Sequence, residues 1–182
     1  NKKELINFSV SIDSPISKGS LVYQNPSLWW SALIKNLTFL KTKIELNKIE
    51  RLSIDGTSGT VLITDHLGNP LDDALMYNDA SAVKESKLVE SISDNHPIVS
   101  TSTNALVRAL SLINKLKKEK YRILHQADWI ACKLINDYTY SDENNALKLG
   151  YDCVERSWPK WFDQLPIEMN SLPNIKIPGQ SI

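Results

Sequence analysis

The sequence has no excess of charge of either sign. Its 182 residues contain 21 lysines and arginines and 21 aspartates and glutamates, so the formal net charge is zero. Domains that bind nucleic acid usually carry a basic excess, so this balance argues against such a partner. No apolar run approaches the roughly 20 residues of a membrane-spanning helix, and no secretory signal pattern opens the chain. We therefore predict neither a nucleic-acid partner nor a membrane partner.

Cysteine and histidine are also scarce. Cys132 and Cys153 match no metal-binding or redox spacing, and reduced thiols in a cytoplasmic protein are the simplest explanation. His66, His96 and His125 lie far apart, so each is expected on the surface or in a loop rather than on a metal. There is no recognisable Ser-His-Asp arrangement, Walker A sequence or Gly-x-Gly-x-x-Gly sequence. These patterns predict no metal site and identify no catalytic residue.

Hydrophobic patterning predicts one α/β unit with a mixed sheet flanked by helices. Alternation over residues 6–12 predicts a half-buried strand, and segments 49–55 and 60–65 are expected to be strands that pair antiparallel, because five residues cannot form a crossover. The predicted helices cover about 26–42, 80–93 and 126–136, with another capped by the hydroxyl run 100–103 and a short one ending at Gly150. Trp29 and Trp30 are expected to pack in the core.

The stretch between the two predicted strands carries the strongest chemical signal. Gly56 and Gly59 let the backbone approach a ligand closely, and Thr57, Ser58 and Thr60 add three hydroxyl groups. Such a turn can bind a polyhydroxylated or phosphorylated small molecule. It can equally be a tight hairpin whose hydroxyls satisfy their own backbone.

Two aspartates stand at predicted strand ends. Asp55 directly precedes the glycine turn, and Asp79 closes the short apolar segment that contains Tyr77. Carboxylates in such places can bind magnesium or accept hydrogen bonds from sugar hydroxyls. They are as often turn formers bonded to nearby N–H groups.

Taken in order, several segments resemble the FGGY family of carbohydrate kinases, and within it the ribulokinase- and xylulokinase-like pentulokinases. The central match is Ile54-Asp55-Gly56-Thr57-Ser58-Gly59-Thr60 within 49–62, followed by 68–71 and by Ala74-Leu75-Met76-Tyr77-Asn78-Asp79. Further matches are 100–102, 126–130, 141–142, 145–151, 172–173 and 178–179. Each piece is weak alone, but together they extend over nearly the whole chain in the family's order.

The resemblance implies a ribonuclease-H-like (actin-like ATPase) fold, with residues 1–182 forming part of an N-terminal lobe. It also implies ATP and Mg²⁺ as cofactors, and phosphoryl transfer to the primary hydroxyl of a pentulose such as D-ribulose or D-xylulose. The family's phosphate loop would precede residue 1 and its general base would follow residue 182. The chain also starts at Asn1 rather than methionine, so we expect a piece of a longer protein that is inactive alone.

The same resemblance assigns substrate-binding roles. The Gly56-Thr57-Ser58 turn is similar to the family's second glycine loop, on the sugar side of the cleft, where Ser58 would bond a sugar hydroxyl. Tyr77 takes the place of a tryptophan that relatives put against the sugar, and Asp79 belongs to the same sugar-binding segment. The arginine of the family's Gln-Asp-x-Arg pattern has no counterpart after Asp79.

Two other functions stay open on the sequence. A nuclease of the ribonuclease-H-like fold would use aspartates such as Asp55 and Asp79 to bind two metal ions, although the neutral charge argues against it. A degenerate kinase lobe would bind sugar without phosphorylating it. The sequence does not identify which pentulose is bound, because in the family side chains from both lobes contact the sugar hydroxyls and distinguish their stereochemistry.

Overall fold

The computed structural model describes residues 6–93, 96, 98–99, 101–116, 120–177 and 179–180. An antiparallel five-stranded sheet of order β1-β2-β4-β3-β5 forms its centre, and a separate pair, β6-β7, is parallel. The strands are β1 (Ile16–Lys18), β2 (Leu21–Gln24), β3 (Val61–Thr64), β4 (Ala74–Leu75), β5 (Arg122–His125), β6 (Tyr140–Asp142) and β7 (Asn174–Lys176). The predicted α/β class is confirmed, but the predicted mixed sheet is not: the five-stranded sheet is antiparallel throughout, and among the described residues parallel pairing is confined to β6-β7.

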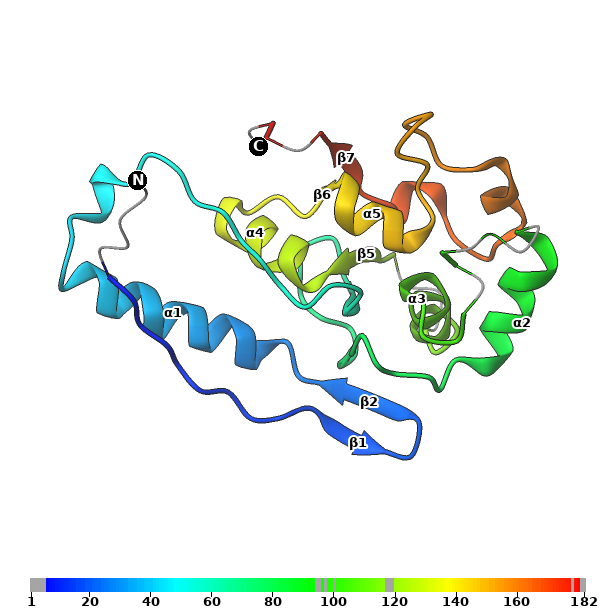
Figure 1. Ribbon diagram of the computed structural model, residues 1–182, viewed down its shortest axis with the longest axis horizontal. Coiled ribbons are helices and arrows are strands. Elements are labelled where there is room, and N and C mark those ends of the chain that lie inside the picture. Colours follow the sequence, from blue (N-terminus) through cyan, green and yellow to red (C-terminus); the bar gives the residue numbers. More distant parts are fainter. Residues whose placement is uncertain are drawn as a thin grey trace.

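Helices cover both faces of the sheet. They are α1 (Ser27–Lys41), α2 (Val83–Ile92), α3 (Ala105–Ile113), α4 (Gln126–Ile135) and α5 (Glu143–Leu149), with short 3₁₀ helices η1 (Leu46–Lys48), η2 (Lys160–Gln164) and η3 (Met169–Ser171). In Figure 1, α2 and α3 lie together at the right, whereas α1 lies at the lower left, where the chain continues from the end of β2.

The central strand β3 connects the two halves of the core. Val61, Leu62 and Ile63 expose none of their surface. Successive side chains of a strand point to opposite faces, so Val61 and Ile63 pack with residues of α2, α3 and α5, whereas Leu62 packs with Trp29 and Trp129. The predicted strand at 60–65 is therefore confirmed as a strand buried on both faces.

The predicted partner of that strand is wrong. Residues 49–57 form no strand. β3 pairs instead with β4 through Val61 and Leu75, and with β5 through four residue pairs that begin with Val61 and His125. Both edges of β3 are thereby occupied, so the preceding segment has no free edge to join. It runs past the start of α4 instead, where Gly56 lies against Ala127.

The strand predicted at residues 6–12 is also wrong. Those residues lie in irregular structure, and the first hairpin is β1-β2, beginning at Ile16. The segment is held by side chains rather than by a backbone ladder: the Phe8 ring stacks on the Phe39 ring of α1, with centroids 3.9 Å apart. Apolar alternation alone did not distinguish the two cases.

The predicted helices at 26–42, 80–93 and 126–136 are confirmed as α1, α2 and α4. Pro26 stands at the N-cap position of α1, and the preceding Asn25 accepts a hydrogen bond from the Ser27 amide through its Oδ1 at 2.8 Å. The helix expected after 100–103 is α3, but its cap is Asn104, which accepts a hydrogen bond from the Leu106 amide at 2.7 Å. Ser100 lies outside the described residues, as does Pro178 of the last matching segment. The short helix that ends at Gly150 is α5, capped by Asp142.

Candidate functional site

Three segments meet at one edge of the central sheet. The loop 56–60 leads into β3, the segment 76–79 follows β4, and α4 follows β5. Val61, the first residue of β3, pairs in antiparallel ladders with Leu75 and His125, the last residues of β4 and β5. The start of β3 and the ends of β4 and β5 therefore lie at the same end of the sheet. The topology therefore brings Ser58 and Tyr77 to one side of the protein.

The loop 56–60 rests on the first turn of α4. The Thr57 amide donates a hydrogen bond to Gln126 Oε1 at 2.7 Å, and the Gln126 amide donates to the Thr60 carbonyl at 3.1 Å. Within the loop, the Thr60 amide donates to the Thr57 carbonyl at 3.1 Å, closing a turn. The turn is thus held by hydrogen bonds to Gln126 of α4, while Thr57 and Ser58 stay exposed.

Gly56 sets how closely this loop approaches the helix. A Cβ atom built on Gly56 would lie 3.0 Å from the Ala127 amide nitrogen and 3.2 Å from the Ala127 Cβ. These atoms belong to the backbone and the base of a helix, and they cannot move aside as a flexible side chain can. Gly56 therefore allows Thr57 and Ser58 to sit directly above α4.

The segment 76–79 is anchored to the β1-β2 hairpin. Asp79 exposes none of its surface, and its Oδ2 accepts a hydrogen bond from the Val22 amide at 2.7 Å. Its Oδ1 accepts from the Ser81 hydroxyl at 2.9 Å and from the Ser81 amide at 3.2 Å. Tyr77, two residues earlier, has 55% of its surface exposed. In this chain Asp79 is a turn former, the alternative that the sequence left open, and Tyr77 is the residue that faces outward.

The buried carboxylate of Asp79 bears on the nuclease alternative. Its oxygens are engaged by backbone and hydroxyl donors, so they are not available as metal ligands in this conformation. Among the described residues, no group of three or more histidine, cysteine, aspartate or glutamate side chains could hold a metal ion.

Sequence reasoning missed Arg108, which joins both loops. It lies in the middle of α3, is 1% exposed, and donates from Nη2 to the Gly59 carbonyl at 2.5 Å. Its Nη1 donates to the carbonyls of Tyr77 at 3.0 Å, Asp79 at 3.2 Å and Thr103. The available signal was a lone cation within the otherwise apolar segment 105–110.

Burial also changes the acidity of Arg108. Loss of hydration lowers the pKa of its guanidinium from 12.5 to about 10, and the nearby Asp79 charge acts in the opposite direction. At neutral pH the side chain therefore remains charged and keeps all of its donors. A buried cation bonded to backbone carbonyls is costly to replace, because its removal leaves several acceptors without a donor.

The expectation that His125 lies on the surface or in a loop is wrong. It ends β5, is 1% exposed, and precedes a buried cluster around Asp128. Asp128 Oδ2 accepts from the Ser141 hydroxyl at 2.8 Å and from the His125 amide at 3.1 Å, and its Oδ1 accepts from Asn145 Nδ2 at 2.8 Å. These bonds connect β5, α4, β6 and α5, so the cluster supports the helix on which the loop 56–60 rests.

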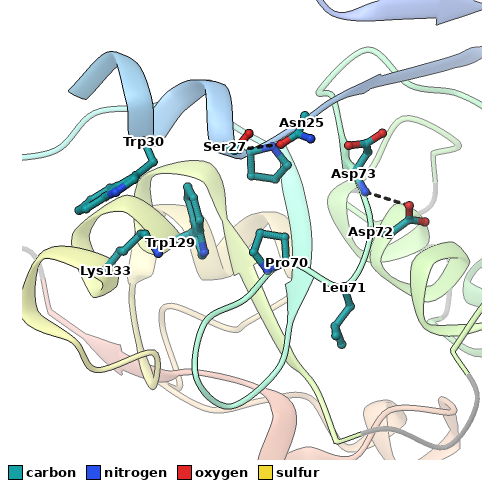
Figure 2. A pocket seen from close by; sticks show the side chains of 10 residues that line it. Asn25, Ser27, Trp30, Pro70, Leu71, Asp72, Asp73, Trp129 and Lys133 are labelled. Atoms are coloured by element: carbon teal, nitrogen blue, oxygen red, sulfur yellow. Dashed lines mark hydrogen bonds between the residues drawn. The ribbon is translucent and has the colours of Figure 1, made fainter. Parts of the chain in front are cut away.

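Two pockets lie elsewhere on the chain. One, of about 490 Å³, is formed by the start of α1, by residues 70–73 and by Trp129 and Lys133 of α4. Figure 2 shows Lys133 beside Trp30 and Trp129, and its Nζ lies 5.1 and 5.3 Å from their ring centroids. The other, of about 740 Å³, lies between residues 50–54, α4 and the β6-β7 pair. Neither is lined by Ser58 or Tyr77, which lie on an open loop surface.

No helix in the described part of the chain has the length and apolar character needed to span a membrane.

The two cysteine thiols differ in environment. Burial raises the pKa of Cys132 to about 12, whereas Cys153 is partly exposed. Neither cysteine contacts the two loops through any hydrogen bond of the described residues: Cys132 donates to the Tyr140 carbonyl and Cys153 to the carbonyls of Glu143 and Tyr151.

Comparison with known proteins gives a consistent set of relatives. No protein-family model matches the chain. It is 21% identical to a xylulose kinase of Staphylococcus xylosus over 182 aligned positions, which cover 93% of this chain and 37% of that protein. The chain therefore spans little more than a third of this curated relative.

Solved structures of sugar kinases have the same fold. Glycerol kinase of Plasmodium falciparum with ADP superimposes with a TM-score of 0.76 at 20% identity, covering 92% of this chain and 37% of that one. Gluconate kinase of Lactobacillus acidophilus gives a TM-score of 0.79 at 17% identity, with 94% and 37% covered. The actin-like ATPase fold of a partial lobe, and the resemblance to FGGY-type carbohydrate kinases, are thereby confirmed.

Proposed function

We propose that this chain is the sugar-binding part of an ATP-dependent carbohydrate kinase, and that the sugar is a pentulose such as D-ribulose or D-xylulose. The observation that carries the proposal is the likeness to a xylulose kinase over 93% of this chain. The arrangement of the two loops supports it, because an exposed serine and an exposed tyrosine stand at one sheet edge on a rigid support. Hydroxyl donors beside an aromatic ring suit a ligand with hydroxyl groups and an apolar C–H face.

Each predicted substrate-binding residue has a role in this proposal. Ser58 exchanges hydrogen bonds with a sugar hydroxyl through its Oγ, and Tyr77 packs its ring against the carbon skeleton. Gly56 and Thr57 shape the loop, since Gly56 permits the close contact with α4 and the Thr57 amide is fixed by Gln126. Asp79 acts indirectly, by fastening the Tyr77 segment to the Val22 amide.

The described residues contain no group of three or more metal-ligating side chains, and the sequence has no Walker A loop. ATP supplies the transferred phosphoryl group and Mg²⁺ neutralises its charge, so we propose that other parts of the protein hold both. The contribution of this chain is to orient the sugar hydroxyl that accepts the phosphoryl group, an effect of positioning rather than of acid–base chemistry.

The test uses the longest natural protein that contains these 182 residues. ATP consumption is measured with D-ribulose, D-xylulose, L-ribulose and glycerol, for that protein and for residues 1–182 alone. We expect the longer protein to phosphorylate a pentulose and the shorter chain to be inactive. A longer protein that is inactive on every polyol would contradict the proposal, and sugar binding without turnover would identify a degenerate lobe.

We predict that Ser58→Ala lowers kcat/KM for the pentulose by about 10- to 100-fold, the loss expected when one or two hydrogen bonds to a substrate hydroxyl disappear. The stability of the protein should not change, because Ser58 is exposed. The matched control is Ser17→Ala, an exposed serine of the edge strand β1. Equal kcat/KM values for the two variants would show that Ser58 does not bind the sugar.

A further inference from the structure

Arg108 makes all of its described hydrogen bonds to backbone carbonyls. Nη2 contacts the Gly59 carbonyl, and Nη1 contacts the carbonyls of Tyr77, Asp79 and Thr103. These acceptors belong to three segments that are distant in sequence. A planar guanidinium can serve them at once because its N–H donors point in fixed, divergent directions.

The two loops have separate anchors apart from Arg108. Gln126 of α4 holds the loop 56–60 through the Thr57 amide. The segment 76–79 is held by the β1-β2 hairpin, through the bond between Val22 and Asp79 and through the Met76 amide, which donates to the Val22 carbonyl at 2.9 Å. Arg108 bonds to both loops, one residue after Ser58 and at Tyr77 itself.

We propose that Arg108 is a positioning residue that fixes the distance between Ser58 and Tyr77, and so sets the affinity for the sugar. The second half of this statement rests on the proposed function; the first half does not. The two terminal nitrogens of the guanidinium hold different loops, Nη2 the first and Nη1 the second, whereas the buried Nε has no hydrogen-bond partner among the described residues. Arg108 reaches the sugar only through the backbone of these loops, so it is not a catalytic residue.

The proposal predicts an asymmetric effect for Arg108→Lys. A lysine carries its donors on one nitrogen, so it can replace the bonds of Nη1 or the bond of Nη2 but not both sets. Three of the four carbonyls lie on the Nη1 side, so the ammonium should stay there and leave the Gly59 carbonyl without a donor. Only the loop 56–60 should then become more mobile.

Hydrogen exchange of the longest natural protein that contains these residues tests this prediction without any measurement of activity. For Arg108→Lys we expect exchange of the Thr60 amide, which donates to the Thr57 carbonyl, to accelerate about 10-fold, with less than about a twofold change at the Asp79 amide, which donates to the Met76 carbonyl. Arg108→Met, which has no donor, should accelerate both loops, and if it fails to fold the lysine variant decides. The control is Leu112→Ala, fully buried one turn further along α3, whose effect should not concentrate in the two loops.

A second measurement concerns the sugar. In the longer protein, Arg108→Lys should raise KM for the pentulose by about 10-fold and leave KM for ATP within about twofold. The control Leu112→Ala, measured below the unfolding temperature of that variant, should change neither KM value. Exchange that rises equally in Arg108→Lys and Leu112→Ala, or an unchanged KM for the pentulose, would overturn the positioning role. If the natural protein phosphorylates no sugar, the function proposal fails, and the exchange data still decide whether Arg108 holds the loops.

Discussion

Replacing Gly68 by alanine should lower the free energy of unfolding by about 3 to 5 kcal/mol, the sum of backbone strain and overpacking. Gly68 has a φ of +79°, in the left-handed region that side chains other than hydrogen disfavour. A Cβ at this position would lie 2.0 Å from Cζ of Tyr138, a residue that is only 7% exposed. The Gly68 carbonyl also accepts a hydrogen bond from Trp129 Nε1 at 2.9 Å, so the turn cannot shift without breaking that bond.

Urea denaturation followed by tryptophan fluorescence measures this effect. Gly19→Ala is the matched control, because Gly19 also has a positive φ, +62°, but a Cβ there meets nothing within 4 Å. It should cost only about 1 kcal/mol, the backbone term alone. A second check is the double-mutant cycle with Tyr138→Ala, whose coupling energy should exceed about 1 kcal/mol. If Gly68→Ala is no more destabilising than Gly19→Ala, the close packing against Tyr138 is not present.

Local features of the fold could be predicted because their causes are local. Asn25 before Pro26 predicts the start of α1, and the acidic and amide residues before Ala146 predict the start of α5. Gly150 has a φ of +98° and ends α5, as expected for a glycine after an apolar-periodic segment. In each case the residue that fixes the boundary lies within one turn of it.

Strand pairing could not be predicted in the same way. The segment 49–55 has the composition of a strand. The two edges of β3 are nevertheless occupied by other segments, residues 74–75 and 122–125. Neither segment is marked as a partner by its own sequence. Residues 6–12 show the same limit. Apolar alternation predicts that one face of the segment is buried, but it does not say whether strand pairing or a contact between side-chain rings, such as Phe8 on Phe39, buries that face.

The candidate site follows the same division. The exposed hydroxyl loop and Tyr77 could be found from the sequence, because turn chemistry and the resemblance point to them directly. The role of Asp79 depends on the Val22 amide, which is 57 positions away, and that of Arg108 depends on carbonyls at 59 and 77. A contact with a backbone atom, whether donor or acceptor, does not depend on which side chain the partner residue carries, so the sequence does not reveal it. A buried cation in an apolar helix is the one sign that such contacts exist.

The support beneath the loop 56–60 can be tested through Asp128. We predict that Asp128→Ala lowers the free energy of unfolding by about 3 to 5 kcal/mol, because it leaves several buried donors without an acceptor. The carboxylate is 5% exposed and accepts bonds from the Ser141 hydroxyl, the Asn145 side chain and the His125 amide. Since these bonds connect α4 to β6 and α5, the variant should also loosen the Gln126 contact with Thr57.

The matched control for Asp128 is Asp142→Ala, which removes the cap of α5. Asp142 accepts one bond, from the Asn145 amide at 2.8 Å, so its loss should cost only about 1 kcal/mol. Denaturation midpoints of both variants give the comparison, and exchange of the Thr57 amide should accelerate in Asp128→Ala alone. Equal destabilisation by the two variants would mean that the buried cluster adds no more than a helix cap. The loop 56–60 would then depend on Gln126 and Arg108 alone for its position above α4.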